Sequence, residues 1–222
     1  NTSAAATIYS RQEPIQLSVP NHVLIAGVGG VGSWVAILLT LSGVHKLSLF
    51  DMDSIEISNL NRTLFTIEDI AKNKAVVMKE KLIKLRPEAI VAAYPLAVLP
   101  CLLTSDYNAL VDCTDDWEVQ RALYLACLKL KVEYVRAGYD GAEHFTVTSV
   151  VPGWHDDELE DGEEIQDNSN SRYSFTPSWA APAMLTAVLA VAKLLKYKDL
   201  EVMGKCFEIL TSSIKKESER QS

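Results

Sequence analysis

A glycine-rich turn follows an apolar run near the start of the chain. The run His-Val-Leu-Ile-Ala (22–26) leads into Gly-Val-Gly-Gly-Val-Gly (27–32), and apolar residues then recur at helical spacing up to Ser42. This order predicts a strand, a tight turn and a helix. Gly27, Gly29 and Gly32 would let the backbone turn sharply, approach a ligand and pack the helix against the strand. The amide groups at the start of such a helix are suited to bind phosphate.

A second short strand (46–50) is predicted to end at Asp51 and to complete a β-α-β unit. Asp51 stands 19 residues after Gly32, where a carboxylate can accept a hydrogen bond from a ribose hydroxyl. The same pattern occurs in sites for NAD, FAD and ATP, so it predicts a nucleotide-binding site but not which nucleotide binds. A tight turn that binds no ligand remains the alternative.

The rest of the chain predicts one α/β domain. Its 222 residues are 48% apolar and 23% charged, the balance of a single globular unit. We expect a Rossmann-like, doubly wound, mostly parallel sheet with antiparallel late strands and a crossover loop at about 152–177. The expected parts are an N-terminal arm (1–19), the domain (20–212) and a polar tail (213–222). Further helices are predicted at 72–85, 117–130 and 181–197, and further strands at 90–94, 108–111, 132–137, 145–151 and 205–210.

The negative charge of the chain has a local origin. The net charge is −8, and eight acids with no Lys or Arg lie between Asp156 and Asp167; without them 21 acids face 21 basic residues. This acidic run is either a solvated loop or an electrostatic guide for a basic partner. Because it would repel an RNA backbone, nucleic acid is not expected as a partner.

Cysteine usage and hydropathy predict the setting. The four cysteines form no C-x-x-C pair, which argues against a zinc site and a disulfide framework. The longest apolar run (179–192) has fourteen residues, whereas a bilayer-spanning helix needs about 20. We therefore expect no zinc, no membrane contact, no secretory signal in the chain as given, and a cytoplasmic location.

A second group of polar residues favours ATP over a nicotinamide. Four segments lie on loops that leave the carboxyl edge of the predicted sheet: Asp51-x-Asp53, Ser-Asn-Leu-Asn-Arg (58–62), Lys74 and Asp-Cys-Thr-Asp-Asp (112–116). Arg and Lys can neutralise triphosphate oxygens, and an aspartate can hold the Mg²⁺ that bridges them. A dehydrogenase needs no such set, so we expect ATP and Mg²⁺.

Together these segments resemble the E1-like ThiF/MoeB/HesA superfamily of ubiquitin-activating-type adenylation domains. The resemblance rests on Tyr-Ser-Arg-Gln (9–12), the glycine turn, the segment 51–62, Lys74 and the segment 112–116, and it covers about residues 9–210. It implies that Arg11 of one subunit reaches the partner's γ-phosphate in a homodimer. The other implied roles are nucleotide contact by Gly27, Gly29, Gly30 and Gly32, ribose binding by Asp51, phosphate binding by Asn59, Arg62 and Lys74, and Mg²⁺ binding by Asp115. Asp53 is placed with the nucleotide-binding residues, although a structural role stays open for it; Asp112 and Asp116 are expected to cap a helix or satisfy backbone groups.

The resemblance also implies an activity: ATP-dependent adenylation of the C-terminal carboxylate of a ubiquitin-like (β-grasp) or sulfur-carrier protein. Relatives that form a thioester carry a cysteine in the crossover segment, but residues 152–205 contain none. We therefore expect an adenylyltransferase without an enzyme thioester, and a structural role for Cys113, Cys127 and Cys206. In addition, Thr63 stands where the family usually has Gln. The alternatives are adenylation of a peptide or tRNA-nucleoside carboxylate, and a non-catalytic scaffold subunit.

Overall fold

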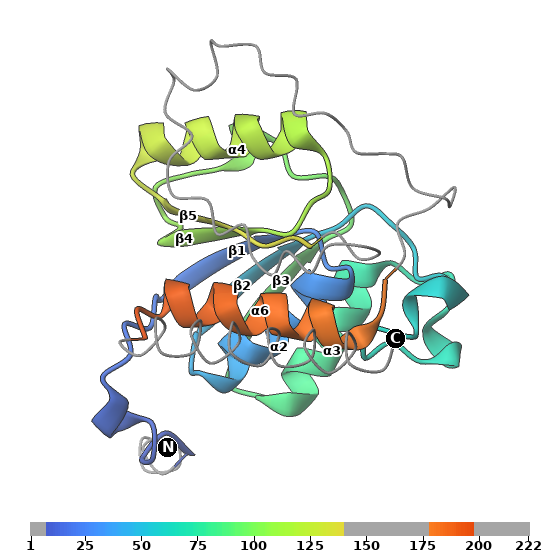
Figure 1. Cartoon of the computed structure of the whole chain (residues 1–222), viewed down its shortest axis with the longest axis horizontal. Helices are drawn as coiled ribbons and strands as arrows, with labels where there is room; N and C mark the ends of the chain where they lie inside the picture. Colours follow the sequence, from blue (N-terminus) through green and yellow to red (C-terminus); the bar gives the residue numbers. More distant parts are fainter. Residues whose placement is uncertain (1–7, 140–177, 198–222) are drawn as a thin grey trace, which may run out of the picture.

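One parallel sheet organises the chain, for which the computed structural model describes residues 8–139 and 178–197. Its five strands stand in the order β3-β2-β1-β4-β5, and every neighbouring pair is parallel (Figure 1). The polypeptide thus starts at the centre, moves to one side and then crosses to the other. The strands are β1 (His22–Ala26), β2 (Lys46–Phe50), β3 (Ile90–Tyr94), β4 (Ala109–Asp112) and β5 (Glu133–Arg136).

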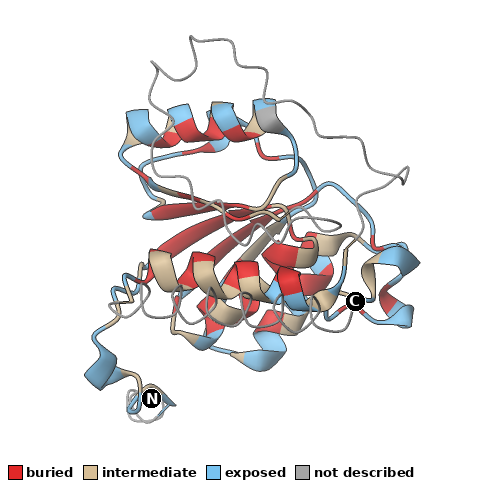
Figure 2. Ribbon diagram, viewed as in Figure 1, coloured by how far each residue is buried: buried red, intermediate tan, exposed pale blue. Residues whose placement is uncertain are grey.

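Helices cover both faces of this sheet. Figure 1 shows α4 (Trp117–Leu130) on one face, with α2 (Gly30–Leu41), α3 (Lys74–Leu85) and α6 (Ala180–Leu194) on the other. β1 is buried along its whole length, as Figure 2 shows, because its alternate side chains enter both layers. Val23 and Ile25 join the core under α2 and α6, whereas Leu24 and Ala26 join the core under α4. This two-sided burial explains why the strand is a continuous apolar run.

The last described helix packs against α2. Ala183, Ala187 and Ala190 are fully buried on α6, so small side chains let the two helices approach closely. The hydroxyl of Thr186 is buried as well and donates to the carbonyl of Pro182 at 2.8 Å. In residues 8–139 and 178–197, no helix has both the length and the apolar character that crossing a membrane requires.

The predicted doubly wound fold is confirmed, and the boundaries of the described helices and strands either agree with the prediction or differ from it by one to three residues. The polar segment after Asp51 is, as expected, an excursion rather than a strand; it contains two short 3-10 helices, η2 (Ile57–Asn59) and η3 (Ile67–Asp69). Two others are η1 (Glu13–Ile15) and η4 (Pro100–Leu102). The strands expected at 145–151 and 205–210, the crossover segment, the acidic run and Cys206 lie outside the described residues.

Candidate active site

A cavity of about 780 Å³ opens at the carboxyl edge of the sheet, where the loops after all five strands meet. This volume lies within the range of small-molecule sites, which is about 300–1,000 Å³. The cavity brings together segments that are far apart in sequence, as expected for a parallel sheet. Eight predicted residues line it: Gly27, Gly29, Gly30, Asp51, Asp53, Arg62, Lys74 and Asp115.

The glycines of the turn are present for different structural reasons. Gly27 has φ +81°, and a Cβ there would lie 2.9 Å from the carbonyl oxygen of Cys113. A Cβ on Gly32 would lie 1.9 Å from the carbonyl oxygen of Gly27, so this position sets how closely α2 packs on β1. A Cβ on Gly29 would meet nothing within 4 Å. Gly32 is therefore required by the fold, while Gly29, at the N-terminus of α2, leaves open space beside the helix amides.

Asp51 is fixed beneath the turn. Its Oδ2 accepts from the backbone N–H of Val28 at 2.6 Å, and its Oδ1 accepts from that of Asp53 at 2.9 Å. Burial raises the pKa of this carboxyl group, and the two backbone hydrogen bonds partly oppose that rise. Each oxygen has lone-pair capacity beyond its single bond, so the carboxylate can still accept from a ribose hydroxyl.

Arg62 lies over the start of α2. The Cδ and Nε atoms of its side chain would be 3.1 Å from a Cβ on Gly30. Its Nη1 donates to the carbonyl of Ser58 and to Oδ1 of Asn61, and its own carbonyl accepts from Nε1 of Trp34 at 2.9 Å. These contacts place a guanidinium group beside the turn whose amides are suited to phosphate.

Lys74 is the first residue of α3, and its charge faces the cavity rather than bulk solvent. The Nζ atom lies 2.8 Å from Oδ2 of Asp53, and the Lys74 side chain is only 12% exposed whereas that of Asp53 is 56% exposed. Asn73 holds this arrangement, because its Nδ2 donates to the carbonyl oxygens of Asp51 and Asp53. The pairing identifies Asp53 as both a cavity residue and the partner of Lys74.

The three aspartates after β4 divide their roles. Asp112 is fully buried and accepts from the N–H and hydroxyl of Thr114 and the hydroxyl of Tyr134, although burial still raises the pKa of its carboxyl group. Asp116 caps α4 by accepting from the N–H of Val119 at 3.1 Å. The predicted structural roles of Asp112 and Asp116 are thus confirmed. Asp115 is exposed and lines the cavity.

Three predicted residues are not in the cavity wall. A Cβ on Gly32 would point at the backbone of Gly27. The Oδ1 of Asn59 accepts instead from the N–H of Glu56 at 3.1 Å, within the capping box of η2. Arg11 lies at the other end of α2, because the neighbouring Gln12 donates to the carbonyl of Ser42. Twelve helical residues correspond to about 18 Å, beyond the reach of an arginine side chain to its own cavity.

The polar residues of the wall that sequence reasoning missed include Arg136, Tyr139 and Ser178. The hydroxyl groups of Tyr139 and Ser178 form a hydrogen bond with one another, and the carbonyl of Ser178 accepts from Nδ2 of Asn61 at 2.8 Å. Arg136 is the next-to-last residue of the strand predicted at 132–137, and that position alone could have placed it near the carboxyl edge. For Tyr139 and Ser178 the sequence contained no signal.

The cysteine thiols near the cavity are not activated. Burial and the Asp112 carboxylate raise the pKa of Cys113 well above its usual value. The same two causes raise the pKa of Cys127 to about 12. Both thiols are therefore protonated near neutral pH, which agrees with structural roles and not with a nucleophile.

Among residues 8–139 and 178–197, no group of three or more His, Cys, Asp or Glu side chains could hold a metal ion by itself.

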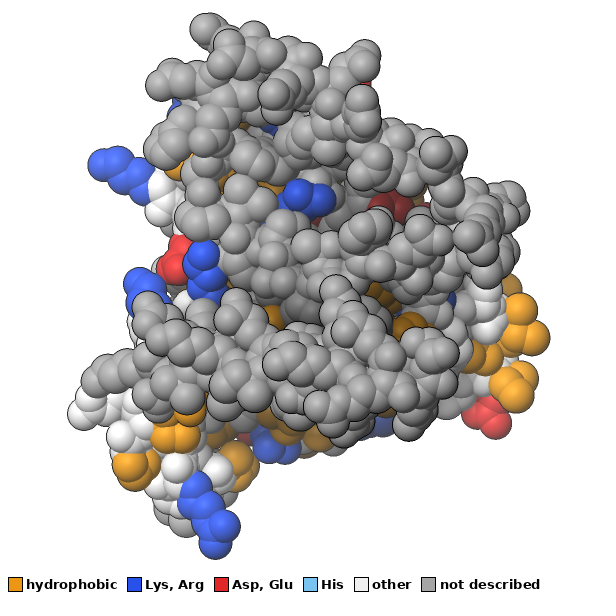
Figure 3. Space-filling view, in the orientation of Figure 1, with side chains coloured by type: hydrophobic (Ala, Val, Ile, Leu, Met, Phe, Trp, Pro, Cys, Tyr) orange, Lys and Arg blue, Asp and Glu red, His pale blue; other side chains and the backbone are white. Residues whose placement is uncertain are grey.

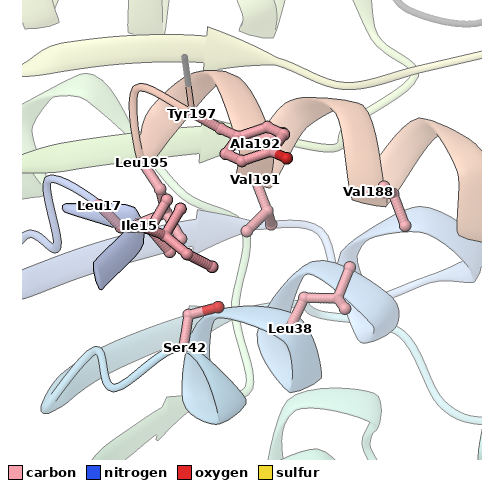
Figure 4. Close-up of a pocket in the computed structure, with 9 residues that line it drawn as sticks. All are labelled: Ile15, Leu17, Leu38, Ser42, Val188, Val191, Ala192, Leu195 and Tyr197. Atoms are coloured by element: carbon pink, nitrogen blue, oxygen red, sulfur yellow. The ribbon is translucent and has the colours of Figure 1, made fainter. Parts of the chain in front are cut away.

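A second cavity, of about 280 Å³, lies away from these groups. It is formed by the N-terminal arm, α2 and α6, and the nine described residues that line it carry no charged side chain (Figure 4). Ile15 and Leu17 of the arm, Leu38 of α2 and Val191 of α6 are among the residues that line it. Its lining residues include no cation to bind phosphate, so the larger cavity is the candidate active site.

Curated relatives of known name match parts of this chain. The tRNA threonylcarbamoyladenosine dehydratase of Escherichia coli is 30% identical over 137 residues, which are 60% of this chain and 51% of that protein. The sulfur carrier protein ThiS adenylyltransferase of the same species is 33% identical over 135 residues, 57% of this chain and 52% of the relative. The chain thus spans about half the length of these curated relatives.

Solved structures extend the similarity over most of the chain. The E. coli dehydratase TcdA in complex with AMP is 25% identical with a TM-score of 0.64, covering 93% of this chain and 95% of that one. E. coli MccB with ATP is 25% identical with a TM-score of 0.63, covering 80% and 55%. The ThiF family model matches residues 8–219. The chain therefore belongs to the ThiF family.

Proposed function

We propose that this chain binds ATP and Mg²⁺ and adenylates a carboxylate group. One observation carries the proposal: a single cavity joins the glycine turn, the Asp51 carboxylate, two cationic side chains and the Asp115 carboxylate. Solved relatives in complex with AMP and with ATP support the nucleotide.

The cavity residues suit this reaction. Asp51 would hold the ribose, and the amides at the start of α2 would receive the phosphates. An oxygen of the substrate carboxylate attacks the α-phosphorus, the bond to the bridging oxygen breaks, and pyrophosphate leaves with the electron pair. Arg62 and Lys74 would stabilise the charge that develops on this leaving group. The carboxylate is already ionised near neutral pH, so the attack requires no side-chain base.

The residues present fit a magnesium ion that is shared with the nucleotide. Mg²⁺ is commonly bound through one or two carboxylates together with substrate phosphates and waters. Asp115 is an exposed carboxylate on the cavity wall and would supply the protein ligand. When bound, the ion would neutralise phosphate charge. We propose no zinc.

As substrate we propose the C-terminal carboxylate of a small ubiquitin-fold or sulfur-carrier protein. The relative named ThiS adenylyltransferase and the structures of MccB with MccA support a polypeptide substrate. A tRNA-nucleoside carboxylate is the second candidate, because the tRNA dehydratase structure covers 93% of this chain and 95% of its own. Both substrates offer the same ionised nucleophile.

We further propose a homodimer in which Arg11 acts on the partner's nucleotide. Its distance from its own cavity, on the order of 18 Å along α2, favours action between subunits. A surface for association is available beside η2 and η3, where Figure 3 shows hydrophobic side chains along the right-hand edge. Ile57 and Ile67 there are 75% and 77% exposed. The free thiols of Cys101, Cys113 and Cys127 support a cytoplasmic setting.

ATP–pyrophosphate exchange tests the proposed activity. We expect exchange that depends on Mg²⁺ and on one of two added substrates, a ubiquitin-fold carrier ending in Gly-Gly or tRNA. Lys74→Ala and Asp115→Ala should each abolish this exchange. Lys84→Ala should not, because Lys84 is an exposed residue of α3, the helix that begins with Lys74. Exchange at background level with every substrate would favour the scaffold role instead.

The dimer proposal has its own test. Arg11→Ala and Lys74→Ala chains are each expected to be inactive, but mixing them should restore part of the activity. In such mixed dimers one of the two sites receives both an intact Lys74 and an intact Arg11. Failure of mixing to restore activity would contradict action across the interface.

A further inference from the structure

Arg136 provides a third cation in the wall of the large cavity, outside the segments that resemble the family pattern. It is the last residue of β5 and pairs in register with Asp112 of β4. The loops after all five strands contribute to the cavity, and β2, β1, β4 and β5 stand in this order along the sheet. With strands about 4.8 Å apart, Arg136 stands roughly 14 Å along the edge from Asp51.

This position is on the acyl side of the proposed nucleotide site. A ribose held at the end of β2 directs its phosphates to the turn after β1, one strand further along. Asp115 follows β4, the next strand, and Arg136 ends the strand beyond it. The β5 end of the cavity therefore lies beyond the phosphates, on the side from which a second substrate can approach.

The charges on this side of the cavity favour a cation there. On this half of the cavity the described wall contains two carboxylates, Asp115 and Asp116, and the one guanidinium of Arg136. A substrate carboxylate approaching both aspartates and the α-phosphate would be repelled without a compensating positive charge. Arginine can also hold a carboxylate by two parallel hydrogen bonds, which would orient it for attack.

The hydrogen bonds of Asp112 are made by other groups. Its carboxylate accepts from the N–H and hydroxyl of Thr114 and from the hydroxyl of Tyr134. The positive charge of Arg136 helps to lower the pKa of Asp112, but the guanidinium is not among these three donors. Arg136 therefore acts on Asp112 through its charge, while the three hydrogen bonds above come from other groups.

We propose that Arg136 binds the C-terminal carboxylate of the peptide substrate and positions it for attack on the α-phosphorus. This inference rests on the proposed function and names the residue that would select an anionic peptide end. Arg62 and Lys74 would act on the nucleotide, whereas Arg136 would act on the second substrate.

The experiment compares two labelled peptides of ten residues that end in Gly-Gly, one with a free carboxylate and one with a C-terminal amide. The full-length chain is saturated with a non-hydrolysable ATP analogue and Mg²⁺, and peptide affinity is measured by fluorescence anisotropy. The variants are Arg136→Gln and Arg136→Lys, with Arg121→Gln as the control because Arg121 is an exposed arginine on α4 outside the cavity wall.

We expect the wild-type chain to prefer the carboxylate peptide by about tenfold or more, the usual scale of a charged hydrogen bond. Arg136→Gln should remove this preference while leaving affinity for the ATP analogue unchanged, Arg136→Lys should retain part of it, and Arg121→Gln should retain it fully. A structural role would weaken binding of both peptides equally and would overturn the inference. So would an equal lack of preference in the wild type. A wild-type chain that fails to bind the ATP analogue would refute the proposed function itself.

Discussion

Two glycines of the same turn should respond oppositely to alanine. At Gly32 the new Cβ would lie 1.9 Å from the carbonyl oxygen of Gly27, about 1.5 Å inside the 3.4 Å at which ordinary contact begins. The clash is with backbone, so α2 must move away from β1. At Gly29 the new Cβ would meet nothing within 4 Å, and φ is −82°, so the residue is not left-handed.

The stability and binding effects should therefore separate. Gly32→Ala should cost about 3 kcal/mol, the upper part of the range for overpacking. For a chain of this size that corresponds to a fall in Tm of about 6–12 °C. Gly29→Ala should change the free energy of unfolding by less than about 1 kcal/mol. Its methyl group would occupy space beside the helix amides and should weaken ATP binding at least tenfold, or about 1.4 kcal/mol.

Thermal unfolding followed by circular dichroism measures the first effect, and calorimetric titration with ATP measures the second. Gly29→Ala serves as the stability control for Gly32→Ala, since both add one methyl group to the same turn. Wild-type ATP affinity in Gly29→Ala would refute the placement of phosphate at the start of α2. An unchanged Tm in Gly32→Ala would refute the reading of that glycine as a packing requirement.

Three further substitutions test other parts of the structure. Burial opposes ionisation of Asp69, but hydrogen bonds, foremost that with Lys81, lower its pKa from 3.8 to about 2. The charge of Asp69 should therefore stabilise the fold above about pH 4. This contribution to stability, up to about 2 kcal/mol, should be lost as the pH falls towards 2. Urea unfolding of wild type and Asp69→Asn should show a difference that shrinks over this interval, and a constant difference would contradict the assignment. Asp116→Ala removes the N-cap of α4 and should lower stability by about 1 kcal/mol, seen as a fall in Tm of about 2–4 °C; an unaltered Tm would argue against the cap. Asn61→Ala removes an acceptor of the Arg62 guanidinium and should lower kcat/KM of the exchange reaction about three- to tenfold with little change in Tm; full activity would show that Arg62 is positioned without it.

The motif residues show how far sequence reasoning reached within the site. Asp51, Arg62 and Lys74 were expected at one edge of the sheet, and the structure places them in one cavity. The sequence did not reveal that the side chain of Asn59 caps η2, or that Arg11 lies at the far end of α2. Spacing along the chain reports which loop a residue occupies, whereas side-chain direction depends on neighbours that only folding supplies.

The strand, turn and helix at residues 22–41 could be predicted without the structure, because the apolar periods and glycine positions that specify them are local. It also predicted the parallel doubly wound class, since alternating strands and helices allow few other arrangements. The strand order and the second side of the cavity became known from the folded structure. Arg136 and Ser178 enter the site through β5 and the start of α6, whose positions depend on long-range packing against β4 and α2. Such pairings depend on complementary surfaces formed by residues that are distant in sequence, so no local pattern could have predicted them.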